Sequence, residues 1–175
     1  MRGVVLVGPR GAGKSRAGAL LARRLALPFV DTDVLVEGQT GRSVAELLAD
    51  GRFRGLEAEA LASVLSGPAA VVAAGGGAVL WAGFRAAAAG WRVLWLDAAP
   101  EVLARRIRHD VRDHPSLTGA PPDVEIAGVA RERSPLYRDA SEARVDTSDL
   151  PPEHVVDRIE NLLAGARGAD VPRAD

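Results

Sequence analysis

The chain has 175 residues, of which 22 are basic and 23 acidic, so its net charge at pH 7 is −1. This length is typical of one domain that buries about 70% of the surface of its unfolded chain. The near-neutral charge argues against a polyanion such as duplex DNA as the main partner. Because the chain has no cysteine, it has no disulfide framework, thiolate metal site or cysteine nucleophile, and a cytoplasmic setting is expected.

Short apolar runs alternate with helical patterns along the chain. The predicted strands are residues 4–7, 28–31, 69–74, 92–96 and 143–146. The predicted helices are residues 16–26, one that starts at Ser43, 56–65, 81–89, 100–108, one that runs through Arg133, and 153–164. This alternation predicts an α/β fold with three layers, in which helices cover both faces of a central five-stranded parallel sheet.

Three stretches bear on domain organisation. Residues 109–123 are polar and contain three prolines, and a connection of this length predicts a mobile lid. Residues 1–165 then form a single domain, and residues 166–175 form a flexible tail. Residues 60–84 carry no charge and would be long enough to span a bilayer, but Pro68 and the glycines Gly75–Gly77 divide them, so no membrane span is predicted.

The loop after the first predicted strand carries the strongest motif. Residues 8–15 read Gly-Pro-Arg-Gly-Ala-Gly-Lys-Ser and match G-x-x-x-x-G-K-[ST], the P-loop, and their glycine spacing differs from that of a dinucleotide-binding loop. Such a loop curls its N–H groups around phosphates at a helix N-terminus, where a lysine reaches the outer phosphates and a serine ligates Mg²⁺. The predicted nucleotide-binding residues are Gly11, Ala12, Gly13, Lys14, Ser15 and Arg16. Lys14 is the only lysine among the 22 basic residues, so this chain keeps an ammonium group where the motif requires one.

A second constellation, Asp31-Thr32-Asp33, follows the second predicted strand. Ligand sites of α/β sheets lie at this edge, and two carboxylates can serve a metal and an acceptor hydroxyl respectively. The alternative is that Asp33 only caps a helix that begins at Val34.

With these motifs the chain resembles the shikimate kinase family over residues 3–165. The further segments that carry the resemblance are Thr40–Ser43, Phe53-Arg54 with Glu57, Gly75–Gly77, Arg133 four residues before Tyr137, and Val145–Thr147. The resemblance implies a P-loop kinase fold and the transfer of the γ-phosphoryl group of ATP, with Mg²⁺, to the 3-hydroxyl of shikimate. It also implies a small-molecule substrate, no nucleic-acid or membrane partner, and a monomer.

The resemblance assigns roles to individual residues. Ser15 and Asp31 would serve the metal, and Lys14 and Asp33 would be catalytic, with Asp33 holding the substrate hydroxyls as the candidate base. Arg54 and Arg133 would bind the substrate carboxylate, since planar guanidinium groups suit carboxylates. Gly75, Gly76 and Gly77 would bring backbone N–H groups against the substrate. The alternatives are solvated helix faces for the two arginines and an ordinary loop for the glycines.

Two features depart from the family pattern. His114 stands where the family usually has a lid arginine that reaches the ATP phosphates, and Arg112 and His114 are candidate nucleotide contacts. The loop at Asp50–Arg52 is shorter than usual, which would shift Arg54. Because of these departures, two alternatives to phosphorylation of shikimate stay open. One is a related kinase with a different hydroxy-acid or polyol acceptor, and the other is a nucleotide-binding homologue with little kinase activity.

Overall fold

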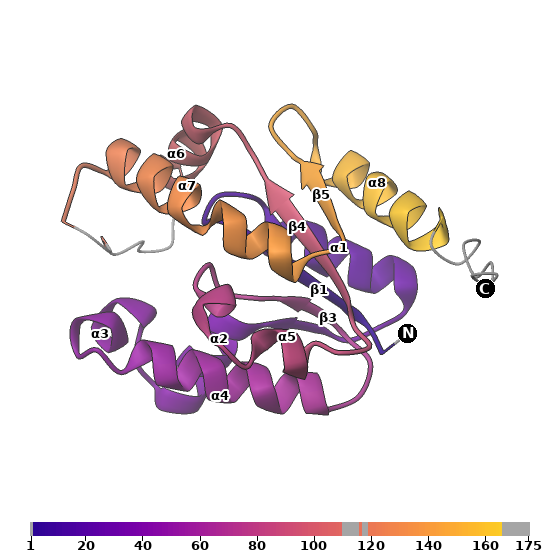
Figure 1. Cartoon of the computed structure of the whole chain (residues 1–175), viewed down its shortest axis with the longest axis horizontal. Coiled ribbons are helices and arrows are strands. Elements are labelled where there is room, and N and C mark those ends of the chain that lie inside the picture. The colour runs from indigo at the N-terminus through magenta and orange to yellow at the C-terminus, as the bar shows by residue number, and fades with distance from the viewer. Residues whose placement is uncertain (1, 110–115, 117–118, 166–175) are drawn as a thin grey trace, which may run out of the picture.

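The computed structural model describes residues 2–109, 116 and 119–165. Five parallel strands form one sheet in the order β2-β3-β1-β4-β5 (Figure 1). The strands are β1 (Val4–Val7), β2 (Phe29–Asp31), β3 (Val71–Ala73), β4 (Arg92–Asp97) and β5 (Ala143–Asp146). The helices are α1 (Lys14–Leu25), α2 (Thr32–Thr40), α3 (Val44–Ala49), α4 (Phe53–Ser66), the 3-10 turn η1 (Ala78–Leu80), α5 (Phe84–Ala87), α6 (Pro100–Arg108), α7 (Pro122–Ala140) and α8 (Pro152–Gly165). The predicted α/β fold with a five-stranded parallel sheet is confirmed.

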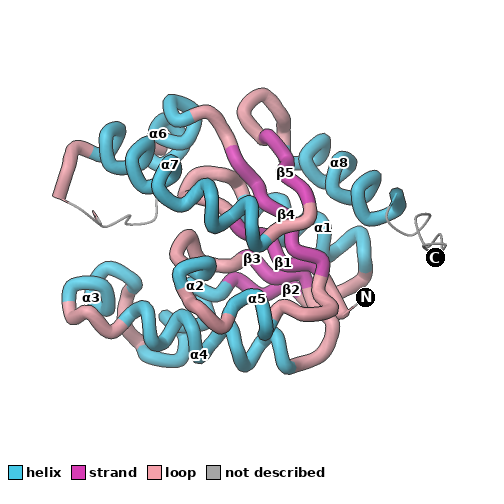
Figure 2. The backbone as a smooth tube through the Cα atoms, in the orientation of Figure 1, coloured by secondary structure: helices cyan, strands magenta, loops and turns pink. Residues whose placement is uncertain are grey.

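Both faces of the sheet are covered by helices, as Figure 2 shows. On one face the core joins Leu6 of β1 to Leu21 of α1 and Ile159 of α8. On the other face the core joins Val7 of β1 to side chains of α4, α5 and α7, among them Tyr137. Because β1 lies between two apolar layers, all four of its residues are apolar and buried.

A third apolar cluster lies among α2, α3 and α4. It consists of Val36, Leu47, Phe53 and Ala60. Phe53 is only 3% exposed and anchors the first turn of α4, from which the neighbouring Arg54 projects. The short loop at Asp50–Arg52 joins α3 to α4 directly, since Asp50 is the C-cap residue of α3 and Arg52 is in the N-cap position of α4, where its side chain forms no capping bond.

Two predicted helices need correction. The segment predicted as a helix at 81–89 is helical only at α5 (Phe84–Ala87), since η1 ends before it at Leu80 and Trp81 is extended. Helix α2, which was expected only as an alternative, is present, and its N-cap is Asp31 rather than Asp33. The carboxylate of Asp31 accepts from the N–H groups of Asp33 and Val34, so the side chain of Asp33 is left for another role.

The predicted lid and tail fall largely outside the described residues. Residues 110–115 and 117–118 of the lid and residues 166–175 of the tail are among those not described. Helix α7 begins at Pro122, so the last two residues of the predicted lid, 122 and 123, lie in this helix. In the described part of the chain no helix is both long enough and apolar enough to cross a membrane.

The capping box predicted at Ser43 is present. Ser43 Oγ accepts from the N–H of Glu46 at 3.3 Å, and Glu46 Oε2 accepts from the N–H of Ser43 at 2.8 Å. These bonds satisfy two donors at the start of α3 that the helix itself leaves without partners.

We expect Ser43→Ala to lower the free energy of unfolding by about 1 kcal/mol and the melting temperature by about 2–4 °C, because alanine cannot accept the bond from Glu46. Thermal unfolding followed by circular dichroism measures this, with Ser43→Thr as a control that keeps the hydroxyl. An unchanged melting temperature in Ser43→Ala would show that the cap does not stabilise the domain.

Candidate active site

The P-loop joins the end of β1 to the start of α1. Gly11 and Gly13 have φ angles of 78° and 88°, in the left-handed region that favours glycine. Lys14 Nζ donates to the carbonyl oxygens of Gly8 at 2.8 Å and Pro9 at 2.9 Å. The ammonium group is therefore held across the loop, where P-loop lysines meet outer phosphates.

Ser15 and Asp31 meet beside the P-loop. Ser15 Oγ donates to Asp31 Oδ2 at 2.6 Å, and Asp31 Oδ1 accepts from the N–H of Asp33 at 3.1 Å. The helix cap thus fixes the carboxylate of Asp31 with one oxygen toward Ser15. A hydroxyl and a carboxylate oxygen are ligands that Mg²⁺ prefers, so this pair fits the predicted metal site.

The carboxylate of Asp33 is buried behind the P-loop. Its Oδ1 accepts no hydrogen bond from the described part of the chain. Burial, and then the neighbouring charges of Glu57 and Asp31, raise the pKa of Asp33 to about 6, against the opposite effect of Lys14 and Arg10. The group is mostly ionised at pH 7 and accepts a proton more readily than an ordinary aspartate.

The loop Gly75–Gly77 follows β3 and packs tightly against charged side chains. A Cβ at Gly77 would collide with Nη1 of Arg54, and a Cβ at Gly75 would collide with Oε1 of Glu57 and stand 2.5 Å from Oδ1 of Asp33. At Gly76 a Cβ would make only ordinary contacts with Arg10, at 3.8 Å. Gly75 therefore has a steric reason to be glycine, which an ordinary connecting loop would not need, whereas the atom beside Gly77 is the tip of a long arginine side chain that a Cβ would displace at little cost.

Arg54 and Arg133 reach this loop from different helices. Arg54, on α4, donates from Nη1 to Oε2 of Glu57 at 2.6 Å, and Glu57 is only 3% exposed. Arg133, on α7, donates from Nη1 to the carbonyl of Gly76 at 2.9 Å. Each guanidinium has further N–H groups in its plane, and two such groups at one loop can bind a carboxylate.

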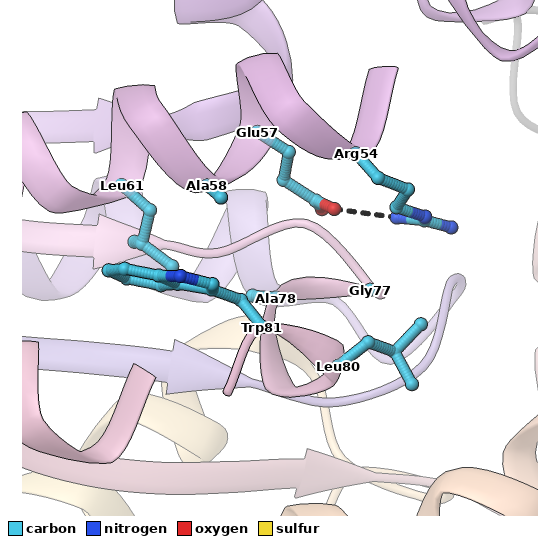
Figure 3. A pocket seen from close by; sticks show the side chains of 8 residues that line it. All are labelled: Arg54, Glu57, Ala58, Leu61, Gly77, Ala78, Leu80 and Trp81. Atoms are coloured by element: carbon cyan, nitrogen blue, oxygen red, sulfur yellow. Dashed lines mark hydrogen bonds and ion pairs between the residues drawn. The ribbon is translucent and has the colours of Figure 1, made fainter. Parts of the chain in front are cut away.

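A pocket of about 150 Å³ adjoins Arg54, between α4 and η1 (Figure 3). Its lining residues are Arg54, Glu57, Ala58, Leu61, Gly77, Ala78, Leu80 and Trp81. Asp33 and Arg133 are not among them. The pocket therefore places apolar side chains beside Arg54, at one end of the glycine loop.

Two charged residues of the site were not predicted to have a role. Arg10 lies within electrostatic range of Asp33, Arg54 and Arg133, and its burial lowers the pKa of its guanidinium. The P-loop pattern admits any residue at this position, so no motif indicates that its side chain turns inward. Glu57 was noted only as part of the resemblance, although its spacing of three from Arg54 on a helix is a signal for an ion pair.

The segment after β5 is connected to the P-loop by hydrogen bonds. Thr147 Oγ1 donates to the carbonyl of Ala12 at 3.1 Å. Arg106, on α6, donates to the carbonyl of Gly11 at 3.2 Å and to the carbonyl of Thr147 at 2.6 Å. Arg106 therefore ties α6 and the loop after β5 to the phosphate loop.

Three predicted nucleotide contacts stay predictions. Arg16 lies on α1 with an exposed side chain. Arg112 and His114 lie outside the described residues. The other predicted residues fall into two adjoining groups, with Lys14, Ser15 and Asp31 at the P-loop and Asp33, Arg54 and Arg133 around Gly75–Gly77.

Comparisons with known proteins agree with this geometry. A family model described as shikimate kinase matches residues 10–164. A shikimate kinase of Symbiobacterium thermophilum is 42% identical over 173 residues, which cover 94% of this chain and 99% of that relative. A shikimate kinase of Bradyrhizobium diazoefficiens is 37% identical over 98% of this chain and 86% of its own.

Solved structures of kinases are also similar to this chain. The structure of shikimate kinase from Acinetobacter baumannii in complex with shikimate matches with a TM-score of 0.88 and 28% identity, over 95% of this chain and 94% of that one. A gluconokinase from Sinorhizobium meliloti matches with a TM-score of 0.55 and 21% identity, over 94% of this chain and 97% of that one, and shares the fold alone. From the family model and the relatives together, this chain belongs to the shikimate kinase family.

Proposed function

We propose that this chain transfers the γ-phosphoryl group of ATP to the 3-hydroxyl of shikimate and releases shikimate 3-phosphate and ADP. As a member of its family it is a small-molecule kinase that uses ATP with Mg²⁺. The observation that carries the proposal is the convergence of Asp33, Arg54 and Arg133 on the loop Gly75–Gly77, beside a P-loop. A carboxylate and two guanidinium groups are complementary to a hydroxylated carboxylic acid.

The donor side consists of the P-loop and its neighbours. Backbone N–H groups of Gly11, Ala12 and Gly13 bind phosphate oxygens, and the ammonium group of Lys14 neutralises charge on the outer phosphates. Ser15 and Asp31 would hold Mg²⁺, which when bound would neutralise charge that develops during transfer. Further nucleotide contacts are proposed for Arg16, Arg112 and His114.

The acceptor side is built around the glycine loop. Arg54 and Arg133 bind the carboxylate of shikimate. The backbone of Gly75, Gly76 and Gly77 lies against the ring of the same molecule. Asp33 accepts the hydrogen bond of the reacting hydroxyl and takes its proton. As that oxygen forms its bond to the γ-phosphorus, the bond to the β–γ bridging oxygen breaks, and the bridging oxygen leaves on ADP.

The proposal includes a monomer that acts in the cytoplasm. One chain supplies both the P-loop and the arginines of the acceptor side, so no second copy is needed to complete the site. The absence of cysteine suits a reducing compartment.

A coupled assay of ADP release tests the function. We expect ADP release to depend on shikimate, with a kcat/KM at least about tenfold above that for quinate or gluconate, because a site built on placed polar groups rejects acceptors that leave those groups unpaired. Equal turnover with gluconate, or ADP release that does not depend on any acceptor, would contradict the proposal.

Arg133→Ala separates acceptor binding from nucleotide binding. We expect the KM for shikimate to rise about 30-fold or more, since loss of one member of a buried charged contact costs about 2–5 kcal/mol, while the KM for ATP changes less than about twofold. The matched control is Arg131→Ala, an exposed arginine on the same helix, which should leave both constants unchanged. An unchanged shikimate KM in Arg133→Ala would remove Arg133 from the site.

A further inference from the structure

Two buried hydroxyl groups hold the glycine loop from opposite sides. Thr32 Oγ1 accepts from the N–H of Gly75 at 2.9 Å. The hydroxyl of Tyr137 donates to the carbonyl of Gly76 at 2.6 Å. Thr32 is 0% exposed and Tyr137 is 1% exposed, so water does not compete for either bond.

Thr32 connects the loop to the carboxylates. It stands between Asp31 and Asp33, in the first turn of α2, and its position is fixed by the cap that Asp31 forms. The bond from Gly75 therefore ties the loop to the same helical turn that carries Asp33. The hydroxyl also lies 3.5 Å from the carbonyl of Ala73, a long hydrogen bond to the strand that leads into the loop.

Tyr137 connects the loop to Arg133. The two residues lie one helical turn apart on α7, and both donate to the carbonyl oxygen of Gly76. The ring of Tyr137 stacks on Trp95, with 5.9 Å between the ring centroids, so the phenol has a fixed direction. Burial raises the pKa of Tyr137 to about 12, and the hydroxyl remains a donor at neutral pH.

These bonds restrict a segment that would otherwise be unusually free. A run of three glycines loses more backbone entropy on ordering than any other sequence of that length. If the loop is already ordered, this backbone entropy is not lost when the acceptor binds. The two hydroxyls order it at successive residues, Gly75 and Gly76, between the helices that supply Asp33 and Arg133.

We propose that Thr32 and Tyr137 are positioning residues for the acceptor, and that their hydroxyl groups fix the Gly75–Gly77 backbone between Asp33 and Arg133. The inference rests on the proposed function, in which Asp33 and Arg133 face the acceptor. The two hydroxyls bond to Gly75 and Gly76, so we expect them to affect acceptor binding more than nucleotide binding.

Near-isosteric substitutions test the two hydroxyls. We expect Thr32→Val and Tyr137→Phe each to raise the KM for shikimate about 5- to 10-fold and to change the KM for ATP less than about twofold. Thr32→Val leaves the buried N–H of Gly75 without its acceptor, and Tyr137→Phe leaves the carbonyl of Gly76 with the bond from Arg133 but without the bond from the phenol. Thr32→Ser keeps the hydroxyl and should restore the shikimate KM. Thr40→Val removes a hydroxyl at the other end of α2, which donates to the carbonyl of Val36, and should leave both constants unchanged.

Melting temperatures recorded beside the kinetics distinguish positioning from stability. A fall in melting temperature with an unchanged shikimate KM, or an equal rise in both KM values, would overturn the inference. If Thr32→Val does not fold, Tyr137→Phe decides by the same criteria. Wild-type protein without shikimate-dependent turnover would instead overturn the proposed function, so the two failures are distinct.

Discussion

Three charged side chains lie against the Gly75–Gly77 backbone at positions from which a Cβ would displace them, and the acceptor half of the site is packed around this loop. Glu57 and Asp33 meet Gly75, and Arg54 meets Gly77. Sheet order explains why this occurs beside the P-loop. Strand β3, which leads into the glycines, lies between β2, which ends at Asp31, and β1, which leads into the P-loop. The carboxyl ends of three neighbouring strands therefore bring donor and acceptor groups to one edge.

The charges of the site are arranged for two anionic ligands. Lys14 lies at the phosphate loop, while Arg10, Arg54 and Arg133 gather around the glycines. Burying several cations together is unfavourable unless opposite charges are near, and Asp33 and Glu57 provide them. A nucleotide and a carboxylic acid then bring the negative charge that these cations stabilise. In the proposed function Lys14 supplies a compact charge for phosphates, and Arg54 and Arg133 supply planar groups for a carboxylate.

Local patterns predicted most of the fold and the donor side, because the apolar run of β1, the P-loop and the capping box at Ser43 are each written in consecutive residues. The sequence could not decide which aspartate caps α2, since Asp31 and Asp33 are both good capping residues and only their geometry separates them. The segment 81–89 was predicted to be a short helix closed by Gly90, but only Phe84–Ala87 of it are helical. The bonds from Thr32 and Tyr137 to the glycine loop join residues 43 and 61 positions apart, a distance over which no local pattern gives information.

A crystal structure of the enzyme with shikimate, ADP and Mg²⁺ would test the central claim most directly, by the distances from the acceptor to Asp33, Arg54 and Arg133. The account predicts the acceptor carboxylate in contact with both guanidinium groups, and the 3-hydroxyl about 2.6–3.2 Å from a carboxylate oxygen of Asp33. The Gly75–Gly77 backbone should keep its bonds to Thr32 and Tyr137. A carboxylate bound away from both arginines, or a 3-hydroxyl out of reach of Asp33, would contradict the account.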